Sequence, residues 1–119
     1  MTKVRESELD SAFSALSDPK RRAVIRELMK RPRRAGELAD DVSMSPPALS
    51  RHLRVLRRSG LIVEEAIEED ARVRMYRVKP SAFKPMSEWL ARVEDFWRDQ
   101  LGAFKAHTEK AGRTRAPRP

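Results

Sequence analysis

Apolar residues recur at intervals of three or four along most of the chain, the spacing that lines one face of an α-helix. Five stretches have this pattern: residues 8–16, 19–30, 35–42, 46–58 and 85–108. Between the last two, over 61–70 and 71–80, apolar and charged residues interleave as in β-strands. The pattern predicts a mainly α fold with a small β-hairpin, in the order α-α-α-α-β-β-α.

The second helix should begin and pack in a well-defined way. Asp18 is a suitable N-cap, because its carboxylate can accept backbone N–H groups of the first turn. Four residues can face the core, Ala23, Val24, Leu28 and Met29, and Ile25 adds to it. The third helix, by contrast, has only Arg34 at its N-cap position, where no short oxygen acceptor is available.

The helix predicted over 46–58 has two unlike faces. Leu49, Leu53 and Leu56 are spaced to pack against neighbours. Ser45 can cap the helix, and proline suits the first turn, where backbone N–H groups lack helical partners. The side opposite the leucines is small and basic: Ala48, Ser50, Arg51, Arg54 and Arg58. With a short helix and a tight turn before it, this arrangement predicts a helix-turn-helix whose second helix enters a DNA major groove.

The predicted organisation is one winged helix-turn-helix domain with a flexible segment at each end. The predicted segments are a flexible N-terminus (1–7), the domain (8–109), the helix-turn-helix (about 35–60), the wing (about 61–79), a C-terminal dimerisation helix (about 85–108) and a disordered basic tail (110–119). The last helix carries more aromatic surface than a small domain needs, which indicates a partner face.

Charge and composition narrow the choice of partner. The 119 residues carry a net charge of +8, with a pI near 10.6, and include no cysteine. A strongly basic chain favours nucleic acid as partner, with an anionic membrane surface second. The absence of cysteine excludes disulfides and thiolate metal sites. Neither a signal peptide nor a run of ~18 apolar residues is evident, so a cytoplasmic, nucleoid-associated protein that does not enter membranes is expected.

Three segments together resemble the bacterial ArsR (arsenical-resistance repressor) family of winged helix-turn-helix regulators. They are "ALSDPKRRAVIREL", "GELADDVSMSPPALSRHLRVLRRSGLI" and "ARVRMYRVKP". The resemblance covers roughly Phe13 to Phe104. It implies a homodimer whose first and last helices build the interface, and repression of transcription by occupation of a palindromic operator. It also implies that four positions lie on or near DNA: Ser45, Ser50, Arg51 and His52.

The candidate site residues form two sets. For binding double-stranded DNA, we expect Ser45, Pro47, Ala48, Ser50, Arg51, His52, Arg54 and Arg58, with Arg72 and Arg74 on the wing. For dimerisation, we expect Leu9, Phe13, Trp89, Leu90, Val93, Phe96, Trp97, Leu101 and Phe104.

No metal or cofactor is expected. Metal-sensing relatives carry a cysteine pair in the third helix, or a D-x-H and H-x-x-H/E pattern in the last helices. This chain has "GELADDV" in the first place and only His107 in the second, so it resembles the metal-independent branch of the family. What that branch senses, whether a small molecule or a protein effector, the sequence does not specify. It also offers no nucleophile–base pair or phosphate loop, so an enzyme is excluded.

Several interpretations stay open from the sequence. His52 either contacts DNA or is a rim histidine that positions its helix. The basic run from Lys20 to Arg34 either supports phosphates or is a solvated face, and Arg21 and Arg22 have acids such as Glu8 or Glu27 as alternative partners. The acidic run around the hairpin turn argues against DNA contact by the tip. The alternative function is a basic nucleoid- or RNA-associated protein without sequence specificity.

Overall fold

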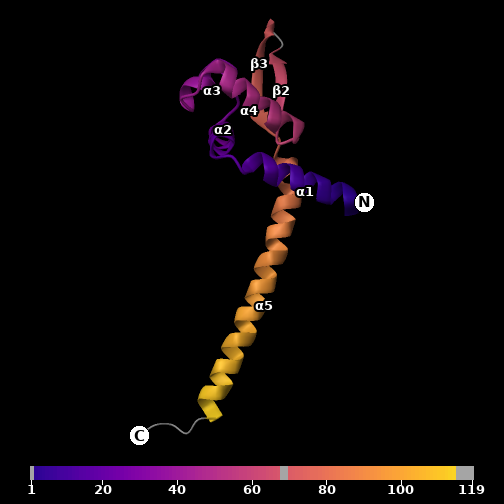
Figure 1. Cartoon of the computed structure of the whole chain (residues 1–119), viewed down its shortest axis with the longest axis vertical. Coiled ribbons are helices and arrows are strands. Elements are labelled where there is room, and N and C mark those ends of the chain that lie inside the picture. The colour runs from indigo at the N-terminus through magenta and orange to yellow at the C-terminus, as the bar shows by residue number, and fades with distance from the viewer. Residues whose placement is uncertain (1, 68–69, 115–119) are drawn as a thin grey trace. The chain divides into compact units, whose positions relative to one another are not determined.

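The computed structural model describes residues 2–67 and 70–114, in two compact units that divide between Met86 and Ser87. The elements in chain order (Figure 1) are α1 (Thr2–Leu16), α2 (Pro19–Lys30), β1 (Arg33–Arg34), α3 (Ala35–Asp41), α4 (Pro46–Arg58), β2 (Ile62–Ile67), β3 (Asp70–Val78), the 3-10 helix η1 (Pro80–Phe83) and α5 (Lys84–Thr114). The predicted mainly α fold with a winged helix-turn-helix order is therefore confirmed.

The wing is part of a three-stranded antiparallel sheet, rather than the two-stranded hairpin predicted. β3 lies in the middle, between β1 and β2. In the added strand, Arg33 pairs with Tyr76 and Arg34 with Met75. Two residues are too few to show an alternating pattern, so this strand could not be found from periodicity. It ties the chain between α2 and α3 to the root of the wing.

The core of the first unit lies where the helices and the sheet root meet. It comprises Ala12, Ala15, Val24, Ile25, Leu28, Leu38, Ala39, Leu49, Leu53, Leu56, Leu61 and Ile62. The expectation for α2 holds at Val24, Ile25 and Leu28. It was wrong for Met29, whose side chain is 68% exposed. A helix position one step beyond Leu28 is rotated by about 100° from it, and here that rotation turns the side chain out of the core.

Matching backbone turns end α3 and α4. After α3, Ser43 has φ +54°, and the Met44 N–H donates to the Ala39 carbonyl at 3.0 Å. After α4, Gly60 has φ +79°, and the Leu61 N–H donates to the Leu56 carbonyl at 3.1 Å. Both are Schellman motifs, in which a left-handed residue lets the chain satisfy the last helical carbonyls. The first forms the turn of the helix-turn-helix, with serine where glycine is usual.

The predicted ends of the chain need correction. Helix α1 begins at Thr2, so residues 2–7 are helical and not a flexible segment. Helix α5 begins at Lys84 and continues to Thr114, six residues past its predicted end near Thr108. Residues 110–114 therefore belong to a helix and not to a disordered tail. Residues 115–119 lie outside the described part of the chain.

Candidate nucleic-acid interface

The start of α4 is fixed by its own sequence. Ser45 is the N-cap, with extended backbone angles, and its Oγ accepts the Ala48 N–H at 3.4 Å. Pro46 and Pro47 occupy the first turn. Because these residues satisfy or remove the donors that a helix start leaves open, they determine where α4 begins and therefore where its N-terminal end points.

The two faces of α4 separate as the sequence predicted. Leu49, Leu53 and Leu56 are buried. The expected DNA-contacting residues on the other face lie at or near the surface: Ser45, Pro47, Ser50, Arg51, Arg54 and Arg58 are exposed, whereas Ala48 and His52 are half-buried. Among the described residues, no carboxylate forms an ion pair with Arg51, Arg54 or Arg58. These guanidinium groups are therefore available to an external anion.

His52 sits at the edge of this face and is close to α2. The Lys20 backbone N–H is the main cause of the lowered pKa of Asp18, and the charge of His52 makes a smaller contribution in the same direction. The imidazole thus lies within electrostatic reach of the N-cap of α2.

The wing arginines differ from Arg51, Arg54 and Arg58 of α4, because carboxylates already pair with them. Arg72 Nε lies 3.3 Å from Asp70, and Arg74 Nε lies 3.7 Å from Glu64. Arg77 donates two hydrogen bonds to Glu65 Oε1, at 2.9 and 2.7 Å. That bond lowers the pKa of Glu65 and raises the pKa of Arg77. The sequence did not reveal the pairs of Arg74 and Arg77, since strand register decides them, whereas Asp70 and Arg72 are neighbours on β3. Two residues of the acidic run, Glu68 and Glu69, lie outside the described chain.

Glu64 also reaches across to α4. Besides Arg74, it forms an ion pair with Arg57 in the last turn of α4. Its side chain is 21% exposed, against 43% for Arg57 and 53% for Arg74. Tyr76 lies directly opposite Glu64 in the strand register. Partial burial, and then the charge of Glu64, raise the pKa of that phenol.

Some arginines of the basic run from Lys20 to Arg34 have structural roles, which the sequence alone did not assign. Arg21 Nε donates to the Ala15 carbonyl at 2.5 Å, and Arg22 donates to the Leu16 carbonyl at 2.8 Å. These side chains therefore satisfy carbonyls at the C-terminus of α1. For Arg21 the acid partner is Asp18, at 3.7 Å, rather than Glu8 or Glu27.

Arg33, in the same run, points inward. Its side chain is 8% exposed and forms ion pairs with Glu27 (2.9 Å) and Asp41. The hydrogen bond that Arg33 donates to the Asp41 carboxylate raises the pKa of Arg33. These contacts join α2, β1 and α3 at the base of the helix-turn-helix. The prediction treated Arg33 as one surface charge among many, and no local signal distinguished it.

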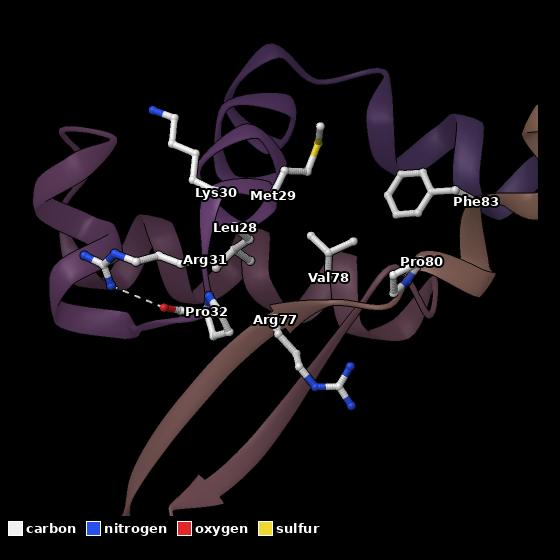
Figure 2. Close-up of a pocket in the computed structure, with 9 residues that line it drawn as sticks. All are labelled: Leu28, Met29, Lys30, Arg31, Pro32, Arg77, Val78, Pro80 and Phe83. Atoms are coloured by element: carbon white, nitrogen blue, oxygen red, sulfur yellow. Dashed lines mark hydrogen bonds between the residues drawn. The ribbon is translucent and has the colours of Figure 1, made fainter.

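A hollow of about 590 Å³ opens on the first unit, beside α2 and the end of β3. Figure 2 shows Met29, Val78 and Phe83 around its apolar part, with the heads of Lys30, Arg31 and Arg77 at its edges. Each of these three cations is paired with a carboxylate outside the hollow: Glu27, Glu37 and Glu65 respectively.

In the second unit, α5 carries an uncovered apolar face. Phe96, Trp97, Leu101 and Phe104 are 56–69% exposed, and the rings of Phe96 and Trp97 meet edge to face at 5.4 Å. The other residues expected at a dimer interface are less exposed: Trp89, Leu90 and Val93 on α5, and Leu9 and Phe13 on α1.

Two further findings concern metal binding and membrane-spanning helices. Over residues 2–67 and 70–114, no group of three or more His, Cys, Asp or Glu side chains is placed to hold a metal ion. None of the described helices has the length and apolar character that crossing a membrane requires.

Known proteins match both the sequence and the fold. Residues 18–63 match the family described as bacterial regulatory protein, arsR family. The HTH-type transcriptional regulator Rv2034 of Mycobacterium tuberculosis is 32% identical over 103 residues, covering 87% of this chain and 91% of its own. The transcriptional repressor SdpR of Bacillus subtilis is 33% identical over 54 residues, covering 45% of this chain and 60% of its own.

A solved structure extends the likeness to three dimensions. The ArsR-like transcriptional regulator from Rhodococcus sp. RHA1 superimposes with a TM-score of 0.70 at 30% identity, covering 85% of this chain and 92% of that one. These relatives are transcriptional regulators and not enzymes, in agreement with the prediction from the sequence. The chain belongs to the ArsR family of bacterial transcriptional regulators.

Proposed function

We propose that this regulator is a homodimeric repressor that occupies a palindromic operator in the bacterial cytoplasm. The observation that carries the proposal is the outer face of α4, where Arg51, Arg54 and Arg58 are exposed with no carboxylate partner among the described residues, while the leucine face is buried. Arginine can bind guanine through two hydrogen bonds, and helix N-terminal amides favour a phosphate. Repression is the activity named for the relative SdpR.

The proposed contacts divide into base reading and phosphate binding. Ser50, Arg51 and Arg54 read base edges in the major groove, where side chains on the outer face of a recognition helix lie. Pro47 and Ala48 allow close approach of the helix start, and Ser45 and Arg58 contact the phosphate backbone. Arg72 and Arg74 give secondary backbone contacts from the wing, and must exchange their carboxylate partners to do so.

The exposed face of α5 supports the proposed dimer. Aromatic and aliphatic side chains of this size are rarely left in water on a monomer when they form a continuous patch. A second copy covering Trp97, Leu101 and Phe104 would remove them from water and would bring two α4 helices to successive major grooves, about 34 Å apart. The apolar residues of α1, Leu9 and Phe13, complete the proposed interface.

The deciding experiment compares two double variants that remove the same charge. Arg51→Ala/Arg54→Ala should lose about 2–6 kcal/mol of operator affinity, since each arginine bound to a guanine contributes about 1–3 kcal/mol. Arg92→Ala/Arg98→Ala, on α5, is the matched control and should keep the preference for operator. Binding is measured by salt-controlled titration against an operator selected from random duplexes and against a scrambled duplex. Equal losses in both variants would contradict the assignment of α4.

The second candidate is a non-specific nucleic-acid-binding protein, which the net charge of +8 favours. Specific regulators prefer their sites by about 10³-fold or more over random duplex. Equal, strongly salt-dependent affinity of the wild-type protein for every duplex tested would support this candidate and overturn the repressor.

A further inference from the structure

We propose that Glu64 restrains Arg57 and Arg74 and thereby limits the sequence-independent part of DNA binding. The inference rests on the proposed function. It assigns a role to a carboxylate that lies beside a surface expected to bind a polyanion, where an acid would otherwise only oppose binding.

The position of Glu64 in the sheet is the first support. Directly opposite residues of paired strands share a face, and side chains two apart on a strand share it too. Glu64 therefore lies on the same face as the buried Ile62 and as Tyr76, which is directly opposite. Glu65 lies on the other face. Of the two adjacent acids, only Glu64 is directed toward α4.

The second support is the pair of arginines that Glu64 contacts. One carboxylate oxygen pairs with Arg57 of α4, and the other lies 3.7 Å from Arg74 Nε of β3. A single acid thus joins the last turn of the recognition helix to the wing. Because Glu64 is more buried than either arginine, it is the fixed member around which both guanidinium groups are arranged.

The third support is the surroundings of Arg57. Arg54, Arg57 and Arg58 line one shallow hollow on the surface of α4. Arg54 and Arg58 have no carboxylate partner among the described residues, whereas Arg57 has one. Glu64 therefore neutralises Arg57, one of the three arginines of this cluster, and also pairs with Arg74 of the wing.

The consequence for recognition follows from how cations bind DNA. Each phosphate neutralised by a free arginine strengthens binding to any sequence and steepens its salt dependence by about 0.9 in log K against log [salt]. Contacts of this kind carry no sequence information. Restraining two arginines lowers the sequence-independent part of binding, while base contacts from Arg51 and Arg54 are unaffected. Glu64 therefore lowers affinity for every sequence by a similar factor, and the preference for operator is left to the base contacts.

Glu64→Gln tests the proposal, because it removes the charge while keeping the shape. The full-length variant should bind a scrambled duplex more tightly than the wild type. Its salt slope should be steeper by about 1–2 on scrambled and operator duplexes alike, so the added loss of affinity between about 50 and 200 mM salt is about 4- to 16-fold. Glu64→Gln/Arg57→Gln should return about half of the added slope.

Glu65→Gln is the matched control, since it removes the same charge one residue away, on the opposite face of the wing. It should leave the slope close to that of the wild type. An equal steepening in Glu65→Gln would show a general charge effect and would overturn the proposal. So would an unchanged slope in Glu64→Gln, or weaker binding together with a lower melting temperature, which is the signature of a purely structural role.

Binding by the wild-type protein distinguishes failure of the role proposed for Glu64 from failure of the proposed repressor function. If the wild type shows no preference for any selected duplex, the proposed function fails first. If it shows that preference and Glu64→Gln changes nothing, only the role of Glu64 fails.

Discussion

Helices α4 and α5 have similar amphipathic patterns but opposite surroundings. The apolar stripe of α4 is buried, with Leu56 fully inaccessible, and the opposite face is basic. The apolar stripe of α5 is in water, where Leu101 is 65% exposed. An amphipathic pattern therefore predicts that one face of a helix will be covered, but it does not identify what covers that face. Neighbouring elements of the same chain cover α4, whereas we propose that a second copy covers α5.

The largest expected effect is on folding stability, and it distinguishes the buried apolar stripe of α4 from the exposed one of α5. Leu56→Ala should lower the free energy of unfolding by about 2–5 kcal/mol, because it removes buried methyl groups and leaves a cavity. Leu101→Ala makes the same chemical change on α5 and should change the stability of the isolated chain by no more than about 0.5 kcal/mol. Chemical denaturation at low protein concentration measures both. Similar losses would mean that the α5 face is buried within its own chain.

The next effect concerns association. Trp97→Ala should weaken dimerisation by about 2 kcal/mol or more, roughly 30-fold in Kd, if this ring is central to the interface between copies. Met29→Ala is the control, since Met29 is a large exposed apolar side chain in the other unit. Analytical ultracentrifugation over a concentration series should show a shift toward monomer for the first variant alone. A monomeric wild-type protein would refute the proposed second copy.

The smallest effect distinguishes the turns at the two ends of α4. Ser43 adopts left-handed backbone angles that an L-residue adopts at a cost, so Ser43→Gly should stabilise the fold by about 0.5–1 kcal/mol. Gly60→Ser should destabilise it by about 1 kcal/mol or somewhat more. No atom lies within 4 Å of a Cβ built on Gly60, so that change isolates the backbone cost from any clash. Thermal unfolding of both variants measures whether each change raises or lowers stability. A loss of stability in Ser43→Gly would show that the Ser43 side chain is needed.

Much of the candidate interface could be predicted from the sequence, because it depends on neighbours along the chain. Ser45 and the two prolines set the start of α4 locally, and the spacing of Leu49, Leu53 and Leu56 sets which face is buried. Once that face is known, the arginines between the leucines must lie on the other side. The predicted separation of the α4 faces is confirmed for this reason, whereas contact with DNA stays a prediction.

Only the tertiary structure decided which charges are paired. Glu64 joins Arg57 and Arg74 across three elements, and Arg33 is buried against Glu27 and Asp41. In the sequence these arginines look the same as Arg54, because charge and helical or strand spacing are all that it records. An ion pair between distant residues depends on strand register and helix packing, which follow from burial of the core as a whole. The sequence alone determined that this surface is basic, and the fold determined which of its cations remain available to DNA.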